Sequence, residues 1–128
     1  MEVNRGWSWS WILIYRGQSG QWAQALHRVT GLGVAFFLLL HIIDTAVLGW
    51  GPGAYNTLVN IWHMPLFRVF QIVLAACLIY HAANGIRVTL IDFWDKASLY
   101  QERLFWGTLV LFFVLFLPTA YFMLISLF

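Results

Sequence analysis

Two histidines lie inside long apolar stretches of this sequence and are the first candidates for chemistry. His41 lies in FFLLLHIIDTA, and His81 lies in CLIYHAANGIR. An ionisable side chain in a membrane-like setting is costly, so each is a candidate functional group. Because neutral imidazole is the commonest metal-ligating side chain, ligand binding is the first hypothesis for both histidines.

His81 shares a helix face with small and polar residues, if its segment is helical. Residues three, four, seven and eleven positions apart lie on one face of a helix. That face carries Asn84, Gly85, Val88 and Asp92, with Cys77 one turn before His81. Gly85 leaves room beside the imidazole for a flat ligand. The alternative is a neighbouring helix, because small residues favour close helix contacts in membranes.

The identity of such a ligand is limited by how few metal-ligating residues the apolar stretches contain. A zinc site needs three or four nitrogen, sulfur or oxygen ligands, and these stretches offer no such cluster. A haem iron needs only one histidine from each side. One histidine from this chain and one from a partner subunit would therefore suffice for haem.

His41 and His81 are expected at different depths. His41 lies about 21 Å beyond His27, and His81 lies about 9 Å before Arg87, at 1.5 Å per helical residue. If His27 and Arg87 mark one membrane surface, the two depths differ by about 12 Å. Two ligands of one iron are only about 4 Å apart, given metal–nitrogen bonds of about 2 Å. The two histidines are therefore predicted to serve different sites.

Other roles remain open for two of the histidines. His41 could instead hydrogen-bond a neighbouring helix, with Asp44 and Thr45 near it on the helical wheel. His63 follows a loop that begins with Gly and Pro, and residues 54–62 of that loop could form a short interfacial helix. His63 is then expected in water or among lipid headgroups.

The segment QALHRVTG, residues 24–31, places His27 and Arg28 at the start of the first long apolar stretch. Basic residues at a membrane surface often serve only as topology anchors. The functional alternative is an anion or carbonyl site. The guanidinium of Arg28 offers planar donors to a carboxylate, such as a haem propionate, or to a quinone oxygen.

Membrane-spanning helices must position these residues. The chain is 62% hydrophobic and 9% charged, whereas soluble domains carry about 25% charged residues. A span needs roughly 20 apolar residues, and lipid favours helices because it cannot satisfy open backbone groups. We therefore predict an all-α membrane protein with a single domain, residues 1–128. The predicted spans are 29–48, 66–91 and 104–128, and the Trp-rich segment 7–15 is predicted to lie along the membrane surface.

The basic residues predict the orientation of the chain. All but Arg68 fall on one side of the three predicted spans: Arg5, Arg16, Arg28, Arg87, Lys96 and Arg103. The positive-inside rule then places the N-terminus and the second loop in the cytoplasm and the C-terminus outside. Because topology explains the net charge of +2, that charge gives no indication of nucleic-acid binding.

The paired segments HRVTG and YHAANGIRVTLIDFW resemble the cytochrome b membrane-anchor subunit of succinate dehydrogenase, respiratory complex II. The resemblance covers residues 15 to about 95. It implies that His81 ligates haem b and that His27 and Arg28 lie near haem propionates and quinone. Asp92 matches an aspartate near the family's quinone site. Gln24 replaces a serine often found there, which departs from the family pattern.

His41, followed by DTA, resembles the anchors of two-haem enzymes that reduce menaquinone. The resemblance implies haem shared with a second anchor subunit of a helical pair, and partnership with a flavoprotein and an iron–sulfur subunit. It further implies the plasma membrane of a bacterium or archaeon. The rivals are the anchor of fumarate reductase or of another quinone-linked dehydrogenase, and a non-redox membrane scaffold whose histidines serve packing.

Overall fold

The structure is a computed structural model that describes residues 19–126 of the chain. Within this range the chain is helical and contains no strand. The helices are α2 (Ser19–Val47), α3 (Pro52–Trp62), α4 (Pro65–Phe93) and α5 (Gln101–Ile125), with 3-10 turns at Leu48–Trp50 and Asp95–Tyr100. The predicted interfacial segment 7–15 lies outside the described residues.

Three helical stretches are long and apolar enough to cross a membrane, which confirms the prediction of an all-α protein with three spans. They are Ser19–Trp50, Pro65–Phe93 and Asp95–Ile125. The first helix begins well before the predicted span at 29, because the more polar residues 19–28 continue the same helix. Most large apolar side chains of the three stretches are exposed in the single chain, as expected where lipid or other subunits cover them.

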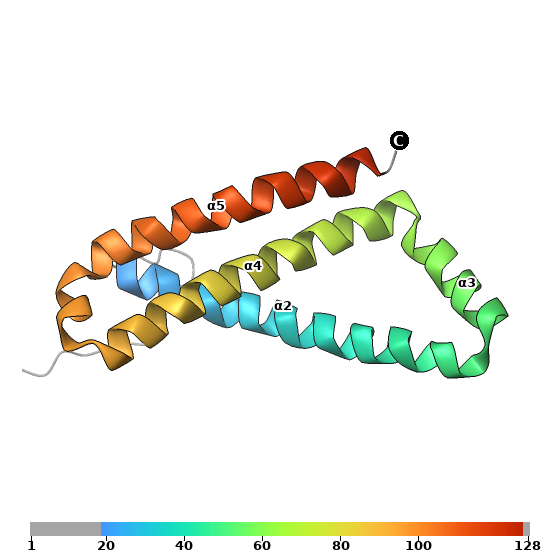
Figure 1. The fold of residues 1–128 in the computed structure, drawn as a ribbon, viewed down its shortest axis with the longest axis horizontal. Helices are drawn as coiled ribbons and strands as arrows, with labels where there is room; N and C mark the ends of the chain where they lie inside the picture. Colours follow the sequence, from blue (N-terminus) through green and yellow to red (C-terminus); the bar gives the residue numbers. More distant parts are fainter. Residues whose placement is uncertain (1–18, 127–128) are drawn as a thin grey trace, which may run out of the picture.

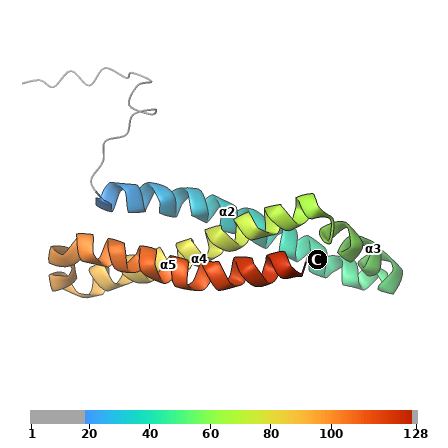
Figure 2. The same cartoon turned by 90° about the horizontal axis from the view of Figure 1, so that it is seen from above.

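The three long helices do not all pack against one another to the same extent. Helix α4 packs against both α2 and α5 (Figure 1), whereas α2 and α5 contact each other much less. Helices α2 and α4 diverge toward one end, where α3 joins them, and α5 stays beside α4 in both views (Figure 2). Helix α2 begins and α5 ends at opposite ends of the molecule, as an odd number of spans requires.

Glycine and proline residues set the turns between helices. Gly51 has a φ of 97°, a left-handed conformation that favours glycine, and it reverses the chain between α2 and α3. Pro52 and Pro65 occupy the first turns of α3 and α4, where a missing N–H costs no helical hydrogen bond. The short helix expected over residues 54–62 is present within α3.

Small residues allow α2 and α4 to approach closely. A Cβ built on Gly33 would lie 2.8 Å from the Sγ of Cys77, and one built on Gly31 would lie 3.1 Å from the Cε1 of His81. Both distances are shorter than ordinary carbon contacts, so larger residues at these positions would push the helices apart. This is the small-residue packing that membrane helices use, because lipid provides no hydrophobic drive for their association.

Helix α5 packs on α4 through an aromatic contact and carries one buried polar residue. The ring of Tyr80 is buried and meets the ring of Phe112 edge-on, with centroids 5.9 Å apart, and Thr108 is also buried. Pro118 lies inside α5 and is exposed. A proline has no N–H, so the carbonyl four residues earlier loses its helical donor.

Candidate functional site

His81 projects from α4 onto α2. Its ring stacks on the ring of His27, with centroids 4.0 Å apart and planes inclined by 9°. Its Nδ1 lies 3.1 Å from the backbone carbonyl oxygen of His27 and 3.5 Å from the Oγ1 of Thr30. The room predicted beside His81 at Gly85 is taken by the neighbouring helix, because the Cε1 of His27 lies 3.9 Å from the Cβ position of Gly85.

The carbonyl contact determines which nitrogen of His81 is free. A carbonyl oxygen only accepts hydrogen bonds, so Nδ1 of His81 is the protonated nitrogen and donates a hydrogen bond to the backbone carbonyl oxygen of His27. In the neutral form of the imidazole, Nε2 is then the unprotonated nitrogen. Histidines that ligate metals are usually oriented in this way, with the other ring nitrogen donating to a carbonyl or carboxylate. The half-buried imidazole of His81 is therefore arranged as a metal ligand would be.

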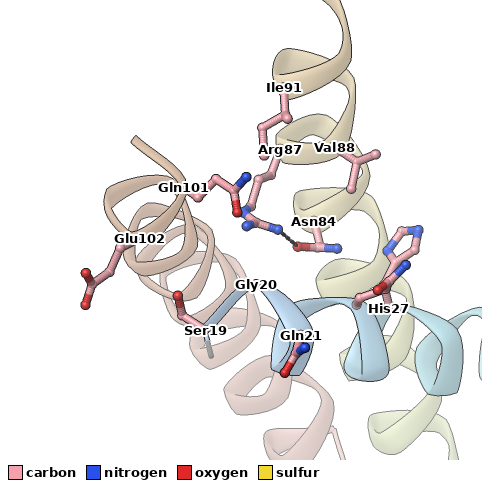
Figure 3. A pocket seen from close by; sticks show the side chains of 11 residues that line it. Ser19, Gly20, Gln21, His27, Asn84, Arg87, Val88, Ile91, Gln101 and Glu102 are labelled. Carbon is pink, nitrogen blue, oxygen red and sulfur yellow. Dashed lines mark hydrogen bonds between the residues drawn. The ribbon is translucent and has the colours of Figure 1, made fainter. Parts of the chain in front are cut away.

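A large cavity of about 780 Å³ adjoins this histidine pair. It lies among the start of α2, the last turns of α4 and the start of α5 (Figure 3). His27 both lines the cavity and stacks on His81, so the two features are continuous. The polar residues that line the large cavity are Ser19, Gln21, Gln24, His27, Asn84, Arg87, Gln101 and Glu102.

Several polar atoms at the wall of the large cavity lack partners. Asn84 is fully buried, and Arg87 is 6% exposed. The Nη1 of Arg87 donates to the Oδ1 of Asn84 over 3.4 Å. Within residues 19–126, the Nδ2 of Asn84, the Nε of Arg87 and the Nδ1 of His27 have no hydrogen-bond partner. Buried polar groups are normally satisfied, so this wall is suited to an anionic or carbonyl ligand.

The structure brings together only some of the residues predicted for this end. Gln24 and His27 line the large cavity, and His81 stands directly behind His27. Arg28 and Asp92 are exposed and do not line it. Any ligand that these two side chains contact must therefore lie on the outer surface of this chain, where other subunits can complete the site.

His41 lies in a different environment, near the end that α3 closes. It is exposed, and its ring stacks on Phe37 with centroids 5.7 Å apart. Thr45, considered as a partner, donates its hydroxyl to the backbone carbonyl of His41 over 2.7 Å. Within the described part of the chain, the imidazole of His41 makes no hydrogen bond, and among these residues only the ring of Phe37 stacks on it.

A second, small cavity of about 370 Å³ lies between the diverging ends of α2 and α4. Asp44 accepts a hydrogen bond of 3.1 Å from the Nε1 of Trp62, which belongs to α3. Gln71 donates to the backbone carbonyl of Trp62, also over 3.1 Å. These two hydrogen bonds connect α3 to α2 and to α4. The small cavity is lined by Phe37, Leu40, Asp44, Trp62, Gln71, Leu74, Ala75, Leu78 and Met123.

The separation between His41 and His81 is larger than expected. Because His81 stacks on His27, the two lie at one level, and His41 is 14 residues further along α2. At 1.5 Å per residue this is about 21 Å, not about 12 Å. The smaller figure assumed that His27 and Arg87 mark the same level, whereas Arg87 lies well beyond His27 toward the end of α4. The two histidines of this chain cannot ligate one iron.

Sequence reasoning missed Asn84 and Arg87 as members of the site. Arg87 was treated as a marker of the membrane surface, although it is almost completely buried. The available signal was their spacing of three and six residues from His81 within HAANGIR, inside a long apolar helix. Polar residues on such a helix usually face the protein interior or a cavity.

Known proteins match most of this chain. The model of the family described as succinate dehydrogenase/fumarate reductase transmembrane subunit matches residues 9–117. The succinate dehydrogenase 2 membrane subunit SdhC of Mycobacterium tuberculosis is 36% identical over 107 residues, which cover 84% of this chain and 79% of that protein. A succinate dehydrogenase hydrophobic membrane anchor subunit of Halobacterium salinarum is 30% identical over 94 residues, covering 73% of this chain and 72% of that protein.

These matches settle what kind of protein the helices form. The family match includes both histidine-bearing spans, the large cavity and most of α5. Members of this family are membrane subunits that work within a complex with other subunits. The resemblance noted in the sequence is thus confirmed, and the chain belongs to the succinate dehydrogenase/fumarate reductase transmembrane subunit family as a succinate dehydrogenase membrane anchor.

Proposed function

We propose that this anchor binds haem b through the Nε2 of His81, with the second axial ligand supplied by a second anchor subunit. The observation that carries the proposal is the hydrogen bond of 3.1 Å from Nδ1 of His81 to the carbonyl of His27. It fixes the tautomer that leaves Nε2 available to a metal. A haem bound there would accept and release single electrons, and the protein would set its ligation and burial.

The residues around His81 fit such a group. Gly31 carries no side chain where one would meet the Cε1 of His81, so the imidazole keeps its position. His27 stacks on one side of the ring and restricts its rotation. Unpartnered polar atoms of the large cavity lie within the same end of the bundle, where the polar edge of a haem could be met.

A quinone site at the same end is the second part of the proposal. Gln24 lines the large cavity, while Arg28 and Asp92 are exposed beside it along their helices. The quinone, proposed to be menaquinone, would bind where these residues meet the walls of other subunits. Electrons from succinate would arrive through a flavoprotein and an iron–sulfur subunit. Because the family includes fumarate reductase subunits, electron flow in the opposite direction is the alternative.

His41 would ligate a second haem, about 21 Å from His81 along the helix axis, with its other axial ligand from the second anchor. The exposure of its imidazole favours a site shared with another subunit. The end with the large cavity would face the cytoplasm and the C-terminus would lie outside, in the plasma membrane of a bacterium or archaeon. The distribution of basic residues supports this orientation.

Replacement of His81 by Ala tests the central assignment. The assembled complex is purified, and haem per complex is measured from a reduced-minus-oxidised spectrum. We expect the haem proposed at His81 to be lost, because the variant removes the imidazole whose Nδ1 is held by the backbone carbonyl of His27 and whose Nε2 would face the iron. His63→Ala, an exposed histidine after α3, serves as the matched control and should keep full haem content. Unchanged haem in His81→Ala would refute the assignment.

A further inference from the structure

Arg87 is a buried positive charge that the described chain does not neutralise. Its side chain is 6% exposed, although it belongs to a membrane-crossing helix. Within residues 19–126, its guanidinium makes one hydrogen bond, the long 3.4 Å contact with the neutral Asn84, and its Nε has no partner. An uncompensated charge in a medium of low dielectric constant is costly, so a structure that retains one normally pairs it with an anion.

The carboxylate nearest to this role within the chain does not fill it. Glu102 lines the large cavity with Arg87, but its carboxylate is directed away from the guanidinium (Figure 3). Glu102 is exposed, and it forms no ion pair with Arg87 in the described chain. The anion that balances Arg87 must therefore come from outside these residues.

We propose that Arg87 and Asn84 together bind a propionate carboxylate of the haem that His81 ligates. This inference rests on the proposed function and names two residues that neither motif reasoning nor the family match assigns to the haem. The guanidinium provides a planar fork of donors that matches a carboxylate. The unpartnered Nδ2 of Asn84 supplies a further donor at the same wall.

The spacing along α4 suits one ligand that reaches both groups. Arg87 follows His81 by six residues, which is about 9 Å along the helix axis. That distance is comparable with the span from the iron of a haem to its propionate carboxylates. His27 connects the two points, because it stacks on His81 and lines the large cavity beside Asn84. Arg28, for which the family resemblance implied a propionate contact, is exposed and lies outside the cavity lining.

The test compares haem with its dimethyl ester, in which both propionates are blocked. The complex is assembled in a host that cannot make haem and is then loaded with either compound. The half-life of each bound compound is measured by transfer to an acceptor protein. The native complex should hold protohaem longer than the ester. Arg87→Gln should reduce that preference roughly tenfold or more, the scale of one charge-assisted hydrogen bond.

The control and the contrary outcomes separate this inference from the proposed function. Arg103→Gln removes the same charge from an exposed position at the start of α5, outside the large cavity, and should keep the native preference. An unchanged preference in Arg87→Gln overturns the inference, including the case in which Arg87 pairs with a carboxylate of another subunit. If His81→Ala keeps the full haem content of the native complex, the proposed function fails instead, whatever Arg87 does.

Two milder variants keep the inference testable if Arg87→Gln does not assemble. Arg87→Lys retains the charge but loses the planar fork, and Asn84→Ala removes the second donor. Each should lower the preference for protohaem over the ester by a smaller factor than the Gln variant. The pH dependence of the haem midpoint potential gives an independent readout, because a propionate held by Arg87 stays ionised to lower pH. An unchanged preference and an unchanged pH profile in both variants overturn the inference.

Discussion

The histidines at the two ends of the α2–α4 pair differ in burial and in their contacts. At one end the helices are in close contact, the rings of His27 and His81 stack 4.0 Å apart, and a backbone carbonyl holds Nδ1 of His81. At the other end the helices diverge toward α3 (Figure 1). There His41 is exposed, and Phe37 is its only ring contact among the described residues. One imidazole is thus oriented within this chain, whereas the other depends on what covers it.

This difference separates two ways of building a ligand site in a small anchor. A histidine that is held by its own chain keeps its tautomer and direction before any partner arrives. An exposed histidine acquires both only on assembly with another subunit. We therefore expect substitutions around His81 to act through local packing, and substitutions around His41 to act through the subunit interface.

The largest effect is expected from Gly31→Leu. A Cβ at this position would already lie 3.1 Å from the Cε1 of His81, so a leucine must displace the imidazole. We expect loss of the haem proposed at His81, measured as haem per assembled complex. Gly33→Leu is the matched control, because it crowds Cys77 instead and overpacks the same interface, at a cost of about 1–3 kcal/mol. Equal haem loss in both variants would mean that helix spacing, not the position of His81, is decisive.

His41→Leu should have the next largest effect. If His41 ligates a second haem, the variant loses about half of the haem of a two-haem complex, while the spectrum of the haem at His81 persists. The distance of about 21 Å between the two histidines makes the losses independent. Spectra of His41→Leu and His81→Ala, each compared with the native complex, check this. A complete two-haem spectrum in His41→Leu would make His41 a packing residue.

A smaller effect is expected from Arg28→Ala. Arg28 belongs to the proposed quinone site, so its removal should lower succinate:quinone activity and leave succinate oxidation by an artificial dye unchanged. The ratio of the two activities is the measurement. Arg103→Ala removes an exposed arginine at the same end and should leave the ratio as it is. If both activities of Arg28→Ala fall in parallel, Arg28 contributes to assembly.

The smallest effect is expected from Trp62→Phe at the diverging end. The change removes the hydrogen bond of 3.1 Å from Nε1 to Asp44 and keeps an aromatic ring in the wall of the small cavity. Hydrogen bonds between membrane helices contribute about 0.6 kcal/mol on average, so the complex should be only slightly less stable. Thermal denaturation in detergent measures this. A marked loss of haem in Trp62→Phe would show that α3 supports the site at His41 more directly.

The elements and their candidate ligands could be predicted from the sequence, because each depends on local information. Apolar runs predict the spans, Gly51 and Pro52 predict the break before α3, and histidines within apolar runs stand out by type. The axial offset between α2 and α4 could not be predicted in this way. Periodicity shows which face of a helix is buried, but not which residue of the next helix it meets. The pairing of His27 with His81 is therefore a finding of the structure.

The predicted members of the site lie only partly together, because their positions also depend on how the helices pack. Gln24 and His27 line the large cavity, but so do Asn84, which the sequence places on the helix face of His81, and Arg87, which the sequence suggests is a marker of the membrane surface. In the sequence, Arg87 looks like a basic residue that marks the membrane surface. It becomes a buried charge only through the packing of the helices. Arg28 and Asp92 are exposed in the isolated chain. The surfaces that would cover them belong to other subunits, and the sequence of this chain does not encode those surfaces.

Pro118 gives α5 an uneven stiffness along its length. The ring removes one main-chain hydrogen bond, so the helix resists bending less at this point than elsewhere. The part of α5 before Pro118 packs on α4 through the ring of Phe112, which meets Tyr80, whereas Met123 lies beyond Pro118 and lines the small cavity. A bend of α5 at Pro118 would therefore move the wall to which Met123 belongs, and with it the volume beside Asp44, without displacing the stacked histidines.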